Sequence, residues 1–235
     1  MKRSLLAAMV AGLLIASSAG AQPYTMPLPS VGVRGGINIA HETLSPSSGV
    51  DLRSRTFGAA GLTYEFSLYQ PVTRPSTGWS LRTELLYDRT GGRIVSGSLA
   101  EDDRVDQLRL APFVAYHAAM GSFVPYLEGG PWAGIDLSHK YTLSGTVNDI
   151  AVSQSGTIPN WRNGDFGLNA GLGFKIPTPA GALSVDGRYS WGLINKYNGS
   201  TSGSGNTIGE GSGLKRHSDG VLIMAGYDFQ LPFMK

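Results

Sequence analysis

Strict alternation of apolar and polar side chains is the feature that most limits how this chain can fold. Residues 183–191 read LSVDGRYSW, in which Leu183, Val185, Tyr189 and Trp191 alternate with Ser184, Asp186, Arg188 and Ser190. Successive side chains of a strand point to opposite faces, so this segment predicts a strand with one apolar and one charged face. A soluble barrel would bury the apolar face. A membrane barrel would turn it to lipid and point the charges into the lumen.

Eight segments carry strand signals of this kind: 31–40, 57–68, 79–88, 106–117, 123–137, 165–175, 182–192 and 220–233. Most have the roughly 9–11 residues of a tilted membrane strand, whereas strands of soluble sheets average about 5–6. The connections 41–56, 89–105, 138–164 and 193–219 are long and polar, and they alternate with the shorter connections 69–78, 118–122 and 176–181. Short periplasmic turns and longer external loops are typical of outer-membrane barrels. The fold class predicted is therefore all-β, an eight-stranded antiparallel up-and-down transmembrane β-barrel with both termini on the periplasmic side.

Aromatic residues gather at the two ends of these segments, as expected for side chains at the two membrane interfaces. Those at the turn ends are Trp79, Tyr116, Phe174, Phe229 and Phe233, and those at the loop ends are Tyr87, Tyr189 and Trp191. Ten polar residues are out of phase with the apolar set: Arg34, Asn38, Glu65, Arg82, Glu84, Asp88, Arg109, Asp186, Arg188 and Asp228. The lumen of an eight-stranded barrel is just wide enough for side chains to fill, so we expect these ten to point inward and pair. Gly167, Gly171 and Gly173 share the inward face and are expected to leave room for arginines opposite.

The N-terminal residues MKRSLLAAMVAGLLIASSAGAQ predict a secretory signal peptide over residues 1–21, with cleavage after Ala19-Gly20-Ala21. Residues 22–235 then form one outer-membrane barrel domain, and the location is the outer membrane of a Gram-negative bacterium. There is no cysteine, which excludes a lipoprotein anchor, disulfides and thiolate metal sites. Cleavage removes Lys2 and Arg3 and leaves equal numbers of basic and acidic residues, so nothing in the charge favours a nucleic-acid partner.

Residues 107–137 resemble the PorT-like outer-membrane β-barrel family. The matching positions there are Leu108, Leu110, Pro112, Tyr116, Pro125, Tyr126, Gly130 and Pro131. Further matches follow in 165–197, at Asp165, Phe166, Gly167, Gly171, Gly173, Arg188, Tyr189, Gly192, Leu193, Asn195 and Tyr197. The resemblance implies the barrel fold and the outer-membrane location. Its best-known member supports a protein secretion system, but the resemblance carries no functional residue onto this chain.

No constellation in the sequence predicts catalysis, a metal or a cofactor. His41, His117, His139 and His217 lack the spacing of metal ligands, and solvated histidines are the expectation. Ser138-His139 and His217-Ser218-Asp219 are the residues an outer-leaflet lipid-modifying enzyme would use, but neighbours on a strand point apart. Glu65, Arg82, Glu84, Arg109 and Arg188 could line a conduit, although a filled lumen is favoured by the small strand number.

The function expected is a non-enzymatic structural or interaction role, exercised through the external loops or the periplasmic face. Asn148, Trp161, Arg162 and Tyr197 are the loop residues singled out for contact with a partner or glycan. The partners expected are outer-membrane lipids, the barrel-assembly machinery during insertion, and a protein at the loops or the periplasmic face. Alternatives are a secretion-system accessory, a lipid-modifying enzyme and a soluble periplasmic barrel that carries a lipid inside.

Overall fold

The computed structural model describes residues 29–45, 51–69, 77–118, 120, 123–147, 149–158, 161–196 and 215–231. The expected signal peptide, Phe233, Asn148 and Tyr197 lie outside these residues. The described chain forms ten strands: β1 (Ser30–Ser45), β2 (Asp51–Tyr69), β3 (Gly78–Thr90), β4 (Gly92–Ser96), β5 (Leu99–His117), β6 (Val124–Val147), β7 (Ile150–Thr157), β8 (Gly164–Thr178), β9 (Gly181–Gly192) and β10 (Lys215–Gln230). None of the described residues belongs to a helix long and apolar enough to cross a membrane.

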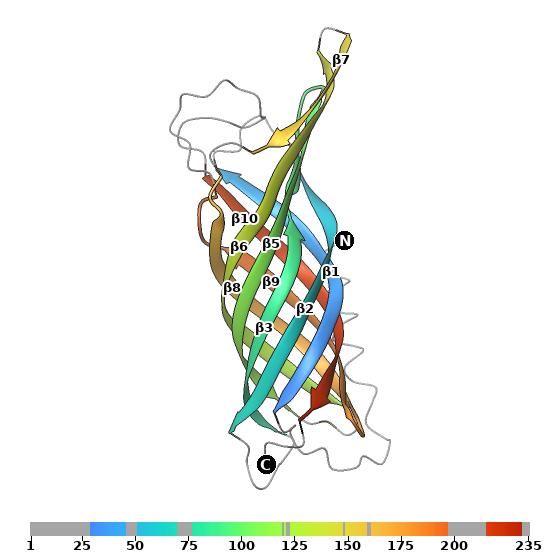
Figure 1. Ribbon diagram of the computed structural model, residues 1–235, viewed down its shortest axis with the longest axis vertical. Coiled ribbons are helices and arrows are strands. Elements are labelled where there is room, and N and C mark those ends of the chain that lie inside the picture. The colour runs from blue at the N-terminus through green and yellow to red at the C-terminus, as the bar shows by residue number, and fades with distance from the viewer. Residues whose placement is uncertain are drawn as a thin grey trace.

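Eight of the strands close into an antiparallel barrel in the order β1, β2, β3, β5, β6, β8, β9, β10 (Figure 1). The ring closes where β1 pairs with β10, from Ser30 opposite Gln230 to Ser45 opposite Lys215. Closure leaves the ring without open edges, which a membrane-spanning sheet requires. The all-β, eight-stranded up-and-down barrel predicted from the alternation is confirmed. We call the end with Ser30 and Gln230 the turn end and the opposite end the loop end.

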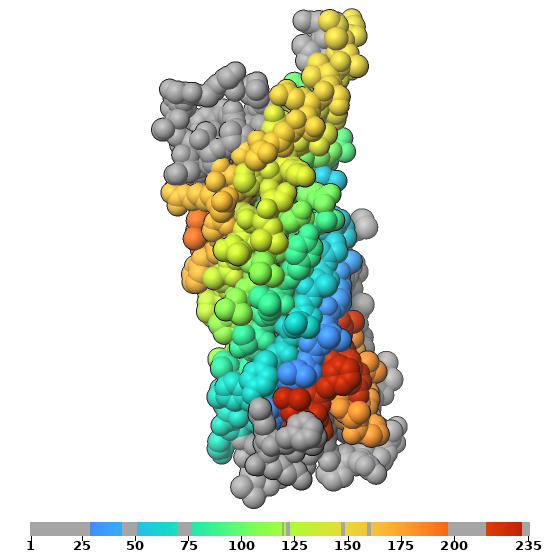
Figure 2. Space-filling model, in the orientation of Figure 1, coloured from blue at the N-terminus to red at the C-terminus, as the bar shows by residue number. Residues whose placement is uncertain are grey.

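Each predicted strand matches one strand of the ring, but strands extend into all four long predicted loops, and two of these loops contain a further strand. Segment 89–105 contains the end of β3, all of β4 and the start of β5, and segment 138–164 contains the end of β6 and β7. At the loop end both faces of the sheet can meet water, so the alternation that marks a lipid-facing strand is lost. β6 and β7 form a hairpin that projects beyond the rest of the described strands (Figures 1 and 2).

The apolar face of the barrel points outward. On β9, Leu183 is 49% exposed and Trp191 43%, whereas Asp186 and Arg188 are buried at 2% and 3%. Aromatic pairs lie near both ends of the wall: Trp79 with Tyr116 (4.9 Å between ring centroids), Tyr227 with Phe229 (4.7 Å) and Tyr189 with Trp191 (4.6 Å). The exposed apolar face and these pairs match a barrel that contacts lipid outside and carries its charges inside.

The β5–β6 ladder is interrupted halfway along the barrel. Pairing stops between Leu110 opposite Ala133 and Val114 opposite Gly129. Pro112 and Pro131 lie in this gap, and proline has no N–H to donate to a ladder. The backbones come very close here, because a Cβ placed on Gly130 would lie 2.0 Å from the carbonyl oxygen of Pro112. The motif residues Pro112, Gly130 and Pro131 therefore have a structural explanation.

Candidate functional site

Most of the buried polar side chains lie in the lumen. All ten residues predicted to point inward are buried there. They are Arg34, Asn38, Glu65, Arg82, Glu84, Asp88, Arg109, Asp186, Arg188 and Asp228, each at most 4% exposed. Several partners were missed by sequence reasoning: Glu42, Asp103, Glu128, Asp136, Lys175, Lys196 and Arg216. Glu128 and Lys175 were detectable, since they lie in phase with the inward positions of their strands. Asp136 was also detectable, because it lies in the predicted strand segment 123–137 in phase with Glu128. Glu42, Asp103, Lys196 and Arg216 were assigned to loops.

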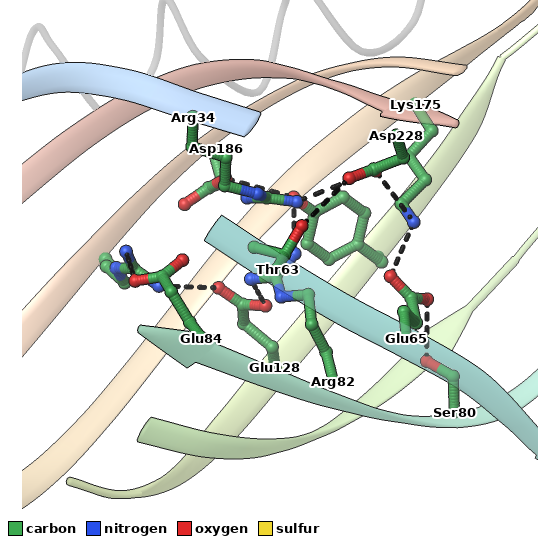
Figure 3. A network of polar contacts seen from close by, with 12 residues as sticks. Arg34, Thr63, Glu65, Ser80, Arg82, Glu84, Glu128, Lys175, Asp186 and Asp228 are labelled. Atoms are coloured by element: carbon green, nitrogen blue, oxygen red, sulfur yellow. Dashed lines mark hydrogen bonds and ion pairs between the residues drawn. The ribbon is translucent and has the colours of Figure 1, made fainter. Parts of the chain in front are cut away.

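Near the turn end, a chain of ion pairs crosses the lumen from wall to wall (Figure 3). The Lys175 ammonium lies 2.6 Å from Glu65 and 3.2 Å from Asp228. Asp228 also accepts a hydrogen bond from Thr63 and lies 3.7 Å from Arg34. These contacts join β1, β2, β8 and β10, so side chains from distant parts of the sequence fix the barrel's cross-section.

Halfway along the barrel, arginines and carboxylates are stacked with buried aromatic rings. Arg82 pairs with Glu128 (Figure 3), and Arg188 pairs with Glu84 at 2.5 Å. The guanidinium groups of Arg82 and Arg188 lie 5.3 and 5.1 Å from the ring of Phe113, which is fully buried. Cation–π contacts of this kind stabilise a desolvated arginine. At this level the lumen is occupied by side chains and paired charge.

A further group of pairs closes the lumen toward the loop end. Arg109 lies 3.2 Å from Asp88 and 4.2 Å from the Trp132 ring. Closer to the loop end, Arg216 pairs with both Glu42 and Asp103.

Lys196 lies beside Arg216 at this end, with its ammonium 2.6 Å from Asp136 and 3.4 Å from Asp165. Trp161 lies over Lys196 and Arg216, each 5.3 Å from its ring, and its indole N–H donates to Asp136 at 2.5 Å. Trp161 is thus a structural cap on the network, and Arg162 beside it is exposed.

We call these ion-paired side chains the lumen network. Every buried lysine and arginine among the described residues pairs with a carboxylate: Arg34, Arg82, Arg109, Lys175, Arg188, Lys196 and Arg216. An unpaired buried charge is costly, and each of these side chains has a carboxylate partner that offsets its burial. A lumen filled in this way favours the closed interior over the conduit.

The inward glycines of β8 make room for more than arginine. A Cβ on Gly171 would lie 2.5 Å from the Cβ of Arg188, as expected from the sequence. A Cβ on Gly167 would instead meet Trp132 at 2.5 Å, and one on Gly173 would meet Tyr126 at 2.6 Å. The expectation that all three face arginines is therefore wrong for two of them, because β6 places aromatic rings beside β8.

The histidines differ from the expectation of solvated side chains. His117 is 2% exposed, and its Nε2 lies 2.9 Å from the Ser80 hydroxyl and 3.0 Å from Glu65. It ends β5 on an inward position, so the strand's phase carries it into the lumen. His139 stacks on Trp161 with 6.2 Å between the rings, and His41 lies 3.3 Å from the Ser54 hydroxyl. In the described part of the chain no three His, Asp or Glu side chains are grouped as metal ligands.

Ser80, His117 and Glu65 have the residue types of a catalytic triad but a different geometry. In a triad the acid holds one ring nitrogen and the serine contacts the other. Here Ser80 and Glu65 approach the same nitrogen, Nε2, and Ser80 also donates to Glu65 at 2.9 Å. The three side chains form a buried hydrogen-bonded group that ties β2, β3 and β5 together.

The loop-end residues that a lipid-modifying enzyme would use are also separated from one another. Ser218 is 3% exposed and points inward, whereas His217 and Asp219 alternate with it on β10. Asp219 accepts hydrogen bonds from Thr43 at 3.0 Å and from the backbone N–H of Gly192 at 3.1 Å. Its carboxylate is used to hold β1 and β9 against β10.

The match to a family model agrees with this architecture. Residues 21–198 match the family described as outer membrane protein beta-barrel domain. No curated protein matches the sequence. Among solved structures, the chain is similar to the attachment invasion locus protein Ail of Yersinia pestis (12% identity, 86% of this chain and 99% of Ail, TM-score 0.39). It is also similar to Neisserial surface protein A (14%, 91% and 100%, 0.43) and to the outer membrane enzyme PagL (16%, 81% and 97%, 0.38).

Proposed function

This chain belongs to the outer membrane protein beta-barrel domain family, and we propose that it is a non-enzymatic interaction protein that displays the β6–β7 hairpin outside the cell. The barrel anchors the protein in the outer membrane, and the hairpin binds the partner. The orientation follows the family pattern, with short turns in the periplasm and long connections outside.

The observation that carries this proposal is the free edge of β7. β7 stands last in the sheet order and, among the described strands, pairs with β6 alone. An exposed edge strand presents unpaired N–H and C=O groups that can add a strand from another chain. β7 reads IAVSQSGT, has no charged residue, and exposes Ile150 at 68%. The partner proposed is therefore a protein with an extended, uncharged segment that pairs with β7.

Edge lysines provide the test, because inward-pointing charge on an edge strand blocks strand addition. A photo-crosslinking residue at Ile150 is expected to capture a partner on intact cells, and Val152→Lys with Gln154→Lys is expected to abolish that crosslink. The matched control places both lysines at Ser144 and Thr146 on β6, whose backbone is already paired with β7. A crosslink that survives the β7 lysines, or is lost equally with the β6 lysines, would refute recognition through the edge.

An outer-leaflet lipid-modifying enzyme remains the alternative from a different class. Mass spectrometry of lipid A from strains with and without the gene tests it directly. We expect identical lipid species, since the serines and histidines described above are separated or engaged in structural contacts. A lipid species that depends on the gene would overturn the non-enzymatic proposal.

A role as a PorT-like secretion accessory is a second candidate, and it rests on the motif residues in 107–137 and 165–197. Pro112, Gly130 and Pro131 shape the β5–β6 gap, and Arg188 belongs to the lumen network. These residues have structural roles in the barrel, so the motif is better evidence for the fold than for a role in secretion. A deletion strain with an unchanged set of secreted proteins would remove this candidate.

A further inference from the structure

At the loop end, neighbouring strands of the sheet place like charges directly opposite each other. In the β2–β4 register Arg53 faces Arg93, and in the β5–β6 register Arg104 faces Lys140. The side chains of Arg53, Arg93 and Arg104 are 62%, 45% and 48% exposed. Side chains directly opposite on a sheet have Cβ atoms about 4.5–5.5 Å apart, and like charges there are destabilising. An anion bound at this wall would relieve the repulsion within both pairs.

Carboxylates on the same wall are too few to do so. Asp102 lies 3.4 Å from Arg55 and 3.8 Å from Arg93, and Asp106 lies 2.5 Å from Arg89 and 3.7 Å from Arg104. Each of these two carboxylates is thus shared between two guanidinium groups. Asp51 is the third, 2.9 Å from Arg53. The cations of this wall are Arg53, Arg55, Arg89, Arg93, Arg104 and Lys140, so positive charge is in excess. We call them the arginine wall.

The arginine wall begins where the apolar outer surface ends. On β3, Leu85 and Tyr87 are 43% and 38% exposed, and Arg89 follows two residues later. On β6, Leu137 is 57% exposed and Lys140 follows at a distance of three residues. The lipid-facing surface therefore ends in an aromatic and leucine border with cations just beyond it. Headgroups of the outer leaflet lie at this height if the loop end faces outward.

We propose that the arginine wall binds the phosphate groups of a phosphorylated glycolipid in the outer leaflet, of the lipid A type. Guanidinium groups bind phosphate oxygens through paired hydrogen bonds, and they are less strongly hydrated than ammonium groups. The glycolipid's acyl chains would lie along the apolar face of β3, β5 and β6, directly below. The proposal rests on the orientation given above and is independent of a partner at β7.

The test compares lipid A with and without its phosphates. Purified barrel in phosphatidylcholine nanodiscs is titrated with bisphosphorylated lipid A or with the dephosphorylated glycolipid, and bound lipid is counted by native mass spectrometry. We expect the phosphorylated form to bind preferentially, and Arg53→Gln with Arg93→Gln to weaken its binding about tenfold. Arg104→Gln with Lys140→Gln tests the second pair and is expected to act in the same direction.

Two controls separate phosphate recognition from net charge. Arg162→Gln with Lys215→Gln removes two exposed cations that are not part of the arginine wall, one in the β7–β8 connection and one on β10, and is expected to leave binding unchanged. Arg53→Lys with Arg93→Lys keeps the charge but loses the paired hydrogen bonds of the guanidinium groups, so its binding is expected to fall between that of the wild type and that of the glutamine variant. Equal binding of dephosphorylated lipid A, or an equal loss in the Arg162–Lys215 variant, would overturn the proposal.

Stability supplies a second readout, which is expected to differ between the two membranes. In phosphatidylcholine alone, removing the Arg53–Arg93 repulsion is expected to leave resistance to urea unchanged or raise it. With bisphosphorylated lipid A present, the same variant is expected to unfold at a lower urea concentration than the wild type. A shift of the same sign in both membranes would show that the pair serves the fold alone and would overturn the proposal.

Discussion

The guanidinium of Arg34 on β1 donates a hydrogen bond to the carboxylate of Asp186 on β9, across 152 positions of sequence and with β10 between the two strands. Both side chains are fully buried. The pair thus bridges two strands that are not hydrogen-bonded to each other, and contacts of this kind hold the barrel interior together. A buried ion pair of this type is costly to break, because the remaining charge has no water to replace its partner.

Breaking this pair is expected to destabilise the barrel strongly. Asp186→Ala should lower the free energy of unfolding by about 3–5 kcal/mol, since it leaves Arg34 without its main partner. Arg34→Met combined with Asp186→Leu should cost clearly less than the sum of the single changes, because no charge is left unpaired. Urea unfolding in lipid vesicles, followed by gel mobility of unboiled samples, measures both. Additive effects would contradict a coupled pair.

Two adjacent glycines on β6 are expected to respond differently to the same added methyl group. A Cβ at Gly130 would lie 2.0 Å from the Pro112 carbonyl oxygen, whereas a Cβ at Gly129 has only the Asn169 oxygen at 3.5 Å. Gly130→Ala should therefore destabilise by about 1–3 kcal/mol or prevent folding, through forced separation of β5 and β6. Gly129→Ala should be nearly neutral. Equal unfolding midpoints for the two variants would contradict the close approach.

The lumen network predicts an electrically silent barrel. Wild-type protein in planar bilayers is expected to give no conductance steps, because paired side chains fill the interior. Phe113→Ala with Trp132→Ala removes two buried rings from one level of the lumen and is expected to introduce small steps. Regular conductance in the wild type would contradict the filled lumen.

The position of the membrane predicts where a charge is tolerated on the outer surface. Leu110 on β5 is 52% exposed and pairs with Leu85, within the apolar band of the wall. Leu110→Arg should destabilise the barrel by about 2–4 kcal/mol in vesicles, the cost of arginine near the bilayer midplane. Ile150→Arg, at the more exposed tip of the hairpin, should change stability little. Urea midpoints of the two variants give the comparison, and equal tolerance would place Leu110 in water.

The ring could be predicted from sequence because the lumen and the lipid impose opposite requirements on neighbouring residues. The inward orientation of Asp186 and Arg188 could be predicted because they lie out of phase with Leu183 and Val185. β4 and β7 were missed because no lipid enforces the alternation beyond the barrel. His117 was misassigned because its place at a turn suggested solvent, whereas the phase of β5 turns it inward. Partners such as Arg34 and Asp186 depend on the registers of three strands, which no local pattern contains.

Neighbouring positions on β9 provide the most direct test that the apolar face meets lipid and the polar face lines a closed lumen. Since the chain has no cysteine, single cysteines for spin labels can be introduced at Leu183, which is 49% exposed, and at Ser184, which is 1% exposed. In vesicles, the label at Leu183 is expected to collide with oxygen, which concentrates in lipid, and not with a water-soluble nickel complex. The label at Ser184 is expected to be shielded from both. Collision of the Leu183 label with the nickel complex would contradict the account and make the barrel a water-soluble one.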